Sequence, residues 1–447
     1  MTLLAIDIGS SSVKCALLHG RDVVGKIVHA KYATRIEGSR VEVDPNVLLK
    51  AIAQATGDVG SNAKKADAIA LSVFSPGWVA MDGAGKPLTP IVTHQDRRSV
   101  DAARALEKKV GEERYYKIAG TRPFPGGISA TTWAWYLQNE PGRLKKADLV
   151  GHLNTFLHRQ FTRARVIDPA NASFMGIYDT AHLSGWSDEL CAAVGAKKSL
   201  LPEVRDANEV GGVLSRQAAA RLGLTAGMPM LVGVVDGSAA MLAAGARVGQ
   251  LLNVCGSTDV LALCTDRFSP HPRLLTRALG IGKTWLSVST LAAAGSAISW
   301  AKDQLFPDCD WPAFEKLVTS LARRGERNAG KVGRGRKPED PAGGVGFDPY
   351  LAGDRMSIEQ RQASFTGLTL AATSQQMLAA VLESLAKASA ARLVLLKETG
   401  TAIRRNVVVT GGAGKLTSVF HRDWPGKWIF KQEDEATLRG LSKLEPR

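Results

Sequence analysis

The stretch "AIDIGSSSVKCALL", residues 5–18, joins two apolar runs through a turn that holds one acid, one glycine and three hydroxyls. The run before the turn alternates as a strand does, and the chain is apolar again from Val13. A glycine lets backbone N–H groups approach a ligand, because no Cβ stands in the way. Successive N–H groups in a tight turn form an anion-binding concavity, and serine hydroxyls add donors for phosphate oxygens. The turn at Gly9 is therefore interpreted as a phosphate-binding loop or, alternatively, as a plain hairpin with Asp7 as a turn residue.

A second stretch, "VCGSTDVLALC" (residues 254–264), has the same plan of strand, glycine turn and strand. The two stretches share glycine, serine and valine at matched places. Together with the β-rich beginnings of both halves, this similarity predicts two domains of similar build, residues 1–226 and 227–447. One such turn in each domain would hold a polyphosphate from two sides. Asp7 beside that site would hold a hydrated Mg²⁺.

The composition is that of a soluble globular protein. The chain has 447 residues, which predicts two or three domains, and 45% of them are hydrophobic. Asp7 interrupts the first apolar run, which argues against a signal peptide. Residues 284–301 approach the length of a membrane span, but they contain several serines and threonines. The five cysteines form no C-x-x-C motif, which predicts a reduced, cytoplasmic protein without a structural metal.

The net charge of +15 raises the question of nucleic-acid binding. Part of the excess lies in residues 323–337, "RRGERNAGKVGRGRK", which lack interleaved aromatic residues for base stacking. We interpret this segment as a solvated loop between domains or over a cleft, and expect no nucleic-acid partner. The alternative, nucleic-acid binding through this loop, predicts steeply salt-dependent binding.

The spacing of apolar residues predicts the main elements around these turns. Strands are expected at residues 3–7, 13–18, 22–29, 66–73 and 406–409, and a hairpin at 77–93. Helices are expected at residues 46–56, 99–110 and 375–396. Ser99 is the expected N-cap of the second helix.

Six segments, which occur in family order and span essentially the whole chain, resemble the FGGY family of carbohydrate kinases. "IDIGSSSVKCAL" is similar to the family's first phosphate loop, with Lys14 in the place of its basic residue. "PLTPIVTHQDRRS" resembles its W-x-D-x-R segment, and "ISATTWAWYLQNEP" resembles a signature that contains a tryptophan. "FDPYLAGDR" and "SFTGLTLAATSQQMLAAVLE" resemble later motifs, and "VVVTGGAGK" resembles the glycine loop that receives adenosine. Each segment alone is a weak signal, but the set is specific.

The resemblance implies an α/β fold of two ribonuclease-H-like domains, as in actin and hexokinase, with a ligand cleft between them. The N-terminal domain would bind the sugar and the C-terminal domain ATP, with Mg²⁺ held by Asp7. Asp236, in "GVVDGSAA", is the catalytic base that the resemblance implies, whereas its position in the sequence alone favours a helix N-cap. The residues expected to bind ATP are Gly9, Ser10, Ser11, Ser12, Lys14, Gly256, Ser257, Thr258, Gly411 and Gly412.

The expected sugar pocket departs from the family pattern. His94 stands where a tryptophan is usual, and residues 75–76 are Ser-Pro where a xylulose kinase typically has Met-His. Asp96 and Arg98 are retained, and Asp96 is expected to hydrogen-bond sugar hydroxyls or, alternatively, to form a salt bridge with a neighbouring arginine. The expected substrate-binding residues are Asp96, Arg98, Ser75 and His94.

The predicted function is ATP-dependent phosphorylation of a sugar or polyol hydroxyl, with a ketopentose such as xylulose as the named substrate. One alternative is a kinase of an unusual polyol or a heptulose. Another is a non-catalytic protein that senses a nucleotide or a sugar on the same fold; the presence of Asp7, Gly9 and Asp236 argues against it. The predicted partners are the sugar and ATP, without a membrane, and a homodimer is left open.

Overall fold

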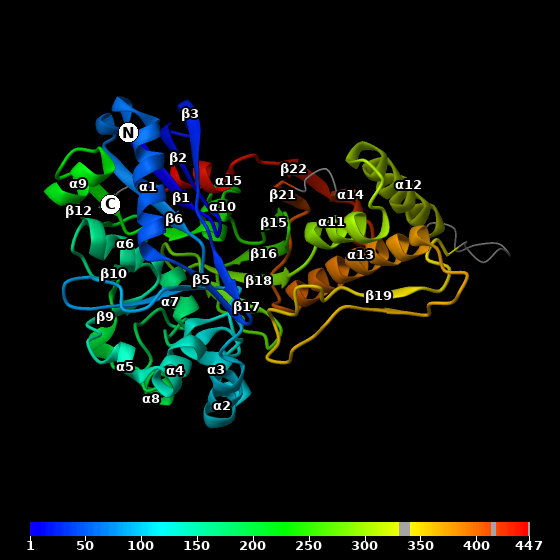
Figure 1. The fold of residues 1–447 in the computed structure, drawn as a ribbon, viewed down its shortest axis with the longest axis horizontal. Helices are drawn as coiled ribbons and strands as arrows, with labels where there is room; N and C mark the ends of the chain where they lie inside the picture. The colour runs from blue at the N-terminus through cyan, green and yellow to red at the C-terminus, as the bar shows by residue number, and fades with distance from the viewer. Residues whose placement is uncertain (330–339, 413–416, 446–447) are drawn as a thin grey trace. The chain divides into compact units, whose positions relative to one another are not determined.

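The computed structural model describes residues 1–329, 340–412 and 417–445. The chain forms two compact units, whose helices and strands are labelled in Figure 1. Unit 1 comprises Met1–Gln250, Leu263–Ser287 and Glu435–Arg447, and unit 2 comprises Leu251–Ala262 and Val288–Asp434.

This division differs from the expected boundary near Ala226. The segment after that residue stays in unit 1, because β13 (Pro229–Leu231) and β14 (Val234–Val235) pair with β6 (Ala68–Val73). The C-terminal segment also belongs to unit 1, where α15 (Ala436–Leu441) packs on α10 (Asp236–Ala243). A Cβ at Gly440 would lie 1.7 Å from the carbonyl oxygen of Ala239, so the two helices approach closely only because residue 440 is glycine.

The central sheet of unit 1 has the strand order β12-β13-β6-β1-β2-β3, with β14 also on β6. The expected strand pair of the opening sequence is confirmed: β1 and β2 are antiparallel, joined by the glycine turn. β1, β6, β13 and β14 run parallel, so that their carboxyl ends meet at one edge of the sheet. The remaining strands of this sheet are β1 (Thr2–Ile8), β2 (Ser12–His19), β3 (Asp22–Lys31) and β12 (Val210–Val213).

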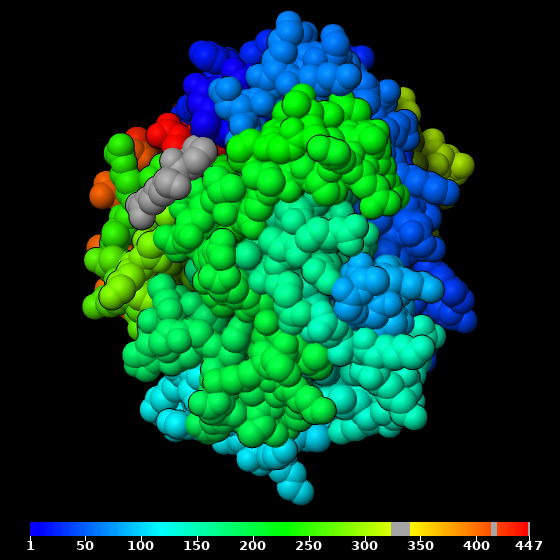
Figure 2. All heavy atoms as spheres, turned by 90° about the vertical axis from the view of Figure 1, so that its left-hand side faces the viewer, coloured from blue at the N-terminus to red at the C-terminus, as the bar shows by residue number. Residues whose placement is uncertain are grey.

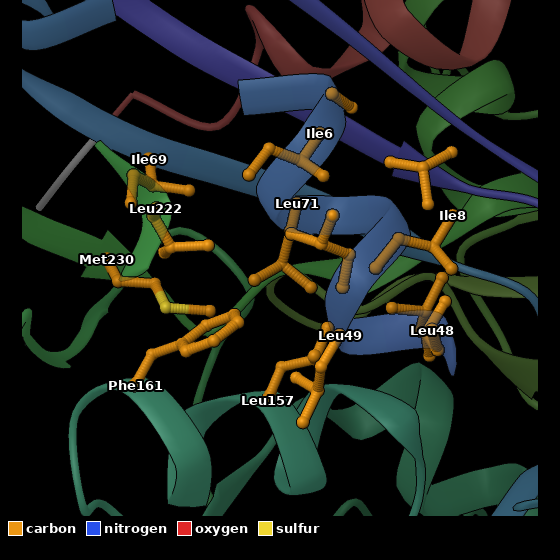
Figure 3. Packing of buried hydrophobic residues seen from close by; sticks show 14 of the residues in the cluster. Ile6, Ile8, Leu48, Leu49, Ile69, Leu71, Leu157, Phe161, Leu222 and Met230 are labelled. Carbon is orange, nitrogen blue, oxygen red and sulfur yellow. The ribbon is translucent and has the colours of Figure 1, made fainter. Parts of the chain in front are cut away.

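Helix α1 (Pro45–Val59) covers one face of this sheet. Its start follows the sequence, because the Asp44 side chain accepts the N–H of Asn46 and proline occupies the first helical position. Its apolar side meets α6 (Leu153–Phe161), α9 (Arg216–Leu222) and the strands in one buried cluster. Figure 3 shows these side chains interlocking, among them Ile6, Ile8, Leu48, Leu49, Ile69, Leu71, Leu157, Phe161, Leu222 and Met230. This core fixes the strand ends that carry the site.

A second sheet of unit 1 has the order β4-β5-β8-β7-β9 and packs on a separate aromatic core. Trp78 on β7 stacks on Tyr136 of α4 (Ser129–Asn139) with ring centroids 4.9 Å apart. Its strands are β4 (Arg35–Glu37), β5 (Arg40–Val43), β7 (Gly77–Met81), β8 (Ile91–Thr93) and β9 (Leu149–Gly151). The expected hairpin is confirmed by the antiparallel pairing of β7 and β8.

The other elements of unit 1 complete these layers. Figure 2 shows a face of unit 1 on which green segments around residues 200–230 lie beside teal segments, and α9 packs on α6. Strands β10 (Val166–Ile167), β11 (Glu203–Val204) and β17 (Leu275–Ala278) and short 3₁₀ turns at Ser61–Lys65 and Lys198–Leu200 also occur. The remaining helices are α2 (Val100–Val110), α3 (Glu112–Ala119), α4 (Ser129–Asn139), α5 (Pro141–Leu144), α7 (Pro169–Met175) and α8 (Asp188–Val194).

The expected capping of α2 by Ser99 is wrong in one respect. Ser99 precedes the helix, but its side chain makes no capping hydrogen bond. Its hydroxyl instead donates to Thr131 Oγ1 at 2.9 Å, because both residues are buried between α2 and α4.

Unit 2 is built on the parallel strands β15 (Leu251–Cys255), β21 (Asn406–Thr410) and β22 (Ile429–Gln432). The expected long helix is confirmed as α13 (Ser374–Glu398), which begins with a capping box between Thr373 and Gln376. Strands β16 (Asp259–Thr265) and β18 (Trp285–Leu291) have residues in both units. The other elements are α11 (Gly295–Leu305), α12 (Trp311–Ala329), α14 (Thr417–Phe420), β19 (Gly346–Asp348) and β20 (Ser364–Thr366).

The basic segment 323–337 is only partly the loop that the sequence predicts. Its first residues, 323–329, continue helix α12, whereas residues 330–337 lie outside the described part of the chain. The part of α12 before this segment has Phe314, Val318 and Leu321 at helical spacing on its buried side. Within the described ranges, no helix combines the length and apolar character needed to cross a membrane.

Candidate active site

Three parallel strands of unit 1 end in one row. Ile8 on β1 is opposite Val73 on β6, and Val73 is opposite Val235 on β14. Gly9, Ser75 and Asp236 therefore follow the same sheet edge within one or two residues of that row. Ligands of open α/β sheets bind at the carboxyl ends of parallel strands. The register thus brings the expected phosphate loop, one expected sugar residue and the expected base together.

The carbonyl groups of the Gly9 turn are held by the segment after β3. The hydroxyl of Tyr32 donates to the carbonyl oxygen of Gly9. The backbone N–H of Tyr32 donates to the carbonyl oxygen of Ser11 at 3.1 Å. Thr34 Oγ1 donates to the Ser10 carbonyl oxygen at 3.0 Å. Three consecutive carbonyl groups are therefore fixed by protein donors, which gives the loop one conformation without a ligand.

The N–H groups of this turn have different partners. The Gly9 N–H closes the turn by donating to Ser12 O at 3.0 Å. In the part of the chain that the structure describes, the N–H groups of Ser10 and Ser11 donate to no protein acceptor. These two N–H groups and the neighbouring hydroxyls are the donors that an anionic ligand would find. The anion-binding interpretation therefore rests on the serines, while the glycine N–H serves the turn itself.

Asp7 is buried at the end of β1, where Ser72 donates to its Oδ1 at 2.8 Å. Burial, together with the nearby charge of Asp236, raises the pKa of Asp7 to about 7, although the Ser72 hydrogen bond and Lys14 act in the opposite direction. A carboxyl group with so few donors has free capacity for a cation. The described residues contain no group of three His, Cys, Asp or Glu side chains that could hold a metal alone.

Lys14 forms an ion pair in unit 1. Its Nζ lies 2.6 Å from Glu435 Oε2, at the start of α15. Both side chains remain 30% exposed, so the pair is open to solvent. To contact a phosphate, Lys14 would have to exchange this partner.

Asp236 is the first residue of α10 and is partly exposed. Val235, not Asp236, holds the N-cap position, and Asp236 Oδ1 accepts the N–H of Gly237 at 2.6 Å. Desolvation raises the pKa of Asp236, while the Gly237 N–H and the charge of Arg277 lower it. The carboxylate keeps free acceptor sites at the strand-end edge, as a general base requires.

Ser75 is held in a buried polar network. Its hydroxyl donates to Asn171 Oδ1, and Asn171 Nδ2 donates to Asp168 Oδ1 at 2.6 Å. Asp168 also accepts Asn154 Nδ2 at 3.0 Å and caps α7 by accepting the N–H of Ala170. The network fixes the Ser75 side chain relative to the sheet edge.

Asp96 and Arg98 are engaged with each other. Arg98 Nη2 lies 2.6 Å from Asp96 Oδ2, and Arg98 Nε donates to Asp96 Oδ1 at 2.9 Å. The N–H of Val41 donates to Asp96 Oδ2 at 2.7 Å, and Glu42 also binds Arg98. Both oxygens of Asp96 are therefore occupied by protein donors. This is the salt-bridge alternative, and binding of sugar by either residue stays a prediction.

His94, the fourth expected sugar residue, lies beside the strand-end edge. Its ring packs edge-to-face on Phe74, with centroids 6.0 Å apart. Because Phe74 directly precedes Ser75, this contact brings two of the expected sugar-binding residues near one another.

In unit 2, the two expected nucleotide loops also follow neighbouring parallel strands. Val254 on β15 is opposite Thr410 on β21, so the Gly256 and Gly411 turns begin at one edge. Gly411 has φ 103°, and a Cβ there would lie 2.4 Å from the Cys255 carbonyl oxygen. Only glycine fits this approach. Gly412 is exposed beside it, and residues 413–416 of this loop lie outside the described chain.

The Gly256 turn is closed in the same way as the Gly9 turn. Its N–H donates to Thr258 O at 2.8 Å. The carbonyl oxygens of Gly256 and Ser257 accept the N–H groups of Gly295 and Ala294, at the start of α11.

Sequence reasoning missed several residues that shape the site. Arg277 and Tyr32 lie in no motif, and Glu435 is far from Lys14 in the chain, so no local pattern could indicate them. Asp168 did carry a signal, since an aspartate directly before a proline is typical of a helix start.

Comparisons with known proteins agree with this arrangement. The FGGY family of carbohydrate kinases, N-terminal domain, matches residues 2–243, and the C-terminal domain of the same family matches residues 251–419. The chain therefore belongs to the FGGY family of carbohydrate kinases, and it is a sugar or polyol kinase that uses ATP.

Individual relatives differ in their named substrates. The gluconokinase of Bacillus licheniformis is 26% identical over 392 residues, 85% of this chain and 74% of the relative. The xylulose kinase of Streptomyces rubiginosus is 24% identical over 422 residues, 93% of this chain and 81% of the relative. The crystal structure of xylulose kinase from Rhodospirillum rubrum superimposes with a TM-score of 0.83 at 22% identity, covering 99% of this chain and 90% of that one. The expected two-domain actin/hexokinase-type fold is thus confirmed.

Proposed function

We propose that this kinase transfers the terminal phosphoryl group of ATP to a substrate hydroxyl whose proton is accepted by Asp236. The position of Asp236 carries the proposal: its partly exposed carboxylate follows the same sheet edge as the Gly9 turn and Ser75. Phosphoryl transfer depends mainly on positioning and on electrostatic stabilisation of spread negative charge. A base at this edge would meet a hydroxyl placed next to the phosphate loop.

The proposed nucleotide contacts follow from the two glycine turns. The free N–H groups of Ser10 and Ser11, with the hydroxyl of Ser12, would hold phosphate oxygens, and Lys14 would add charge after leaving Glu435. In unit 2, Gly256, Ser257 and Thr258 would contact phosphates. Gly411 and Gly412 would lie against adenosine.

Asp7 is the residue that fits a metal ion at this edge. Mg²⁺ commonly binds through one or two carboxylates while keeping several waters and phosphate oxygens. The single buried carboxylate of Asp7, with one hydrogen-bond donor, matches that requirement better than a cage of protein ligands. When bound, the ion would neutralise charge on the phosphates. A cation would also favour the ionised form of Asp7.

A ketopentose such as xylulose is the substrate that the sequence predicts, with a heptulose or an unusual polyol as the alternative. The side chains of Ser75 and His94 are polar and would face hydroxyl groups. ADP release from a panel of ketoses, aldoses, polyols and sugar acids identifies the substrate.

The test of the mechanism is Asp236→Asn, which keeps the shape of the side chain but removes the proton acceptor. We expect kcat on the best substrate to fall by about 10²–10⁴-fold, the usual contribution of a general base. The dissociation constant for ATP should change little, because the glycine turns hold the phosphates. Turnover, nucleotide binding and a thermal melt are measured together.

The matched control is Asp44→Asn, an exposed aspartate whose side chain caps the start of α1. Asparagine caps about as well as aspartate, so activity and stability should both persist. If Asp236→Asn folds and turns over at a near-normal rate, Asp236 is a structural residue and the proposed mechanism is wrong. If the native chain hydrolyses or transfers no phosphate with any panel member but binds ATP, the non-catalytic sensor is correct instead.

A further inference from the structure

Arg277 on β17 is a buried cation next to the proposed base. Its side chain is only 3% exposed, and it lies against α7 and the start of α10. The charges of Asp236 and Asp168 both act on it. Burial nevertheless lowers the pKa of Arg277 to about 10, which means that its surroundings do not fully replace the lost water.

One half of the guanidinium group is satisfied by the protein. Nη1 donates to Ser238 Oγ and to the Ala278 carbonyl oxygen, the latter at 3.1 Å. The guanidinium carbon lies over the ring of Phe174, 5.4 Å from the ring centroid. These contacts fix the orientation of the group.

The other edge of the group has no such partner. Among the residues that the structure describes, neither Nε nor Nη2 of Arg277 donates a hydrogen bond. Nη2 lies beside Gly237: a Cβ at that position would be 3.3 Å from it. Gly237 is partly exposed, as is Asp236 before it, so the residues beside this edge reach the protein surface.

Neither nearby carboxylate forms a contact ion pair with Arg277. Asp168 uses its oxygens for Asn154, Asn171 and the N–H groups that begin α7. Asp236 accepts from the Gly237 N–H instead. A buried guanidinium without a contact anion is costly, and the usual remedy is a bound carboxylate or phosphate.

The same edge binds carboxylates elsewhere in this protein. Nε and Nη2 of Arg122 donate to the two oxygens of Glu107 at 2.7 and 2.9 Å. Arg114 binds Glu189 through the same two atoms. Two parallel N–H groups match the two oxygens of a carboxylate, which makes this a strong and directional contact.

We propose that the Nε–Nη2 edge of Arg277 receives a carboxylate of the sugar substrate, so that this kinase phosphorylates a hydroxyl of a sugar acid. The inference rests on the proposed function and makes the acceptor an aldonic or uronic acid in place of the neutral ketopentose. One guanidinium matches one monoanionic carboxylate, whereas a phosphate dianion would call for a second cation. Ser75 and Asp236 at the same edge would contact the hydroxyl groups of the chain.

The experiment compares matched substrates on the native protein: D-gluconate with D-glucitol, and D-xylonate with D-xylitol, each with ATP. D-Xylulose and 6-phospho-D-gluconate complete the set. We expect kcat/KM to be higher for each aldonate than for its alditol. In Arg277→Met the preference should fall by about 10- to 100-fold, mainly through KM, since a hydrogen bond to a charged group is lost. The aldonate preference of Arg277→Lys should lie between that of the native protein and that of Arg277→Met, because lysine keeps the charge but loses the paired N–H groups.

Arg114→Met is the control, because it removes a carboxylate-binding arginine that is 63% exposed on another surface of unit 1; the aldonate preference should be unchanged. Thermal melts with D-gluconate or D-glucitol, without ATP, give a second readout that does not depend on turnover. The inference is overturned if neutral substrates are preferred, if the phosphorylated acid is preferred, or if Arg277→Met lowers kcat for all substrates equally. If Arg277→Met does not fold, the inference is tested by the aldonate preference of the native protein and by its decrease in Arg277→Lys. Failure of every substrate with ATP would instead refute the proposed function.

Discussion

The Gly9 turn of unit 1 and the Gly256 turn of unit 2 share a backbone plan but use their acids in different ways. In both, a glycine N–H closes the turn by donating to a carbonyl two or three residues later. Asp7, before the first glycine, accepts one side-chain hydrogen bond and has a pKa raised to about 7. Asp259, after the second glycine, is fully buried and saturated by Arg392 and Asn253. The same turn thus leaves one carboxylate available for chemistry and uses the other for stability.

The largest expected effect comes from removing Arg392, the charged partner of Asp259. Arg392→Met removes the guanidinium that contacts both the carboxylate and the carbonyl oxygen of Asp259. The remaining buried charge should lower the free energy of unfolding by about 3–5 kcal/mol. The measurement is denaturant unfolding at neutral pH.

The double variant Arg392→Met/Asp259→Asn is the control for this prediction. It should recover part of the loss, because no unpaired charge remains. A loss below about 1 kcal/mol in the single variant would show that the Asp259 pair contributes no more than a surface pair.

The next effect concerns the unsaturated acid. Asp7→Asn should lower kcat by about 10²–10³-fold, a loss typical of one electrostatic contact in the transition state. Its effect on stability should have the opposite sign. Because the pKa of Asp7 rises from 3.8 to about 7 on folding, ionising it costs stability. That cost is absent below about pH 4, grows up to about pH 7 and is constant above it.

The asparagine variant escapes this cost, so its thermal melting point should exceed that of the native protein at pH 8 and approach it at pH 4. Melts across this range, beside assays of turnover, check both halves of the prediction. An Asp7→Asn variant that is less stable at pH 8 would place Asp7 in the same structural class as Asp259.

The two turns also show which features of the structure can be predicted from the sequence. Alternation and glycine placement were sufficient to predict both strand–turn–strand units, since these depend on neighbours in the chain. The partners of the acids could not be predicted, because Ser72 and Arg392 come from distant segments. The domain boundary differs for the same reason. The sequence around β13 and β14 resembles the start of a new domain, but these strands pair with β6, which is distant in the sequence.

In the candidate site, too, the positions of residues were easier to predict than their partners. The register of β1, β6 and β14 brings Gly9, Ser75 and Asp236 to one edge. Asp96 and Arg98 follow a family motif, yet the structure binds them to each other. A motif identifies residue types and spacing, whereas the availability of a side chain depends on all of its neighbours.

The smallest expected effect tests the contact that joins the Gly9 turn to the C-terminal segment. Lys14 can reach a phosphate only by leaving Glu435, and the Gly256 turn has no lysine at the corresponding place. A pair whose side chains are 30% exposed contributes at most about 1 kcal/mol, so Glu435→Gln should hardly change the melting point. Removing this competitor should lower KM for ATP by up to about fivefold, the factor that corresponds to about 1 kcal/mol. The gain should shrink at high salt, where exposed charges are screened.

In Lys14→Met the same Glu435→Gln change should have no effect on KM, because no ammonium group is left to release. An unchanged or higher KM in Glu435→Gln alone would mean that Glu435 holds Lys14 in position, or that Lys14 does not contact the nucleotide.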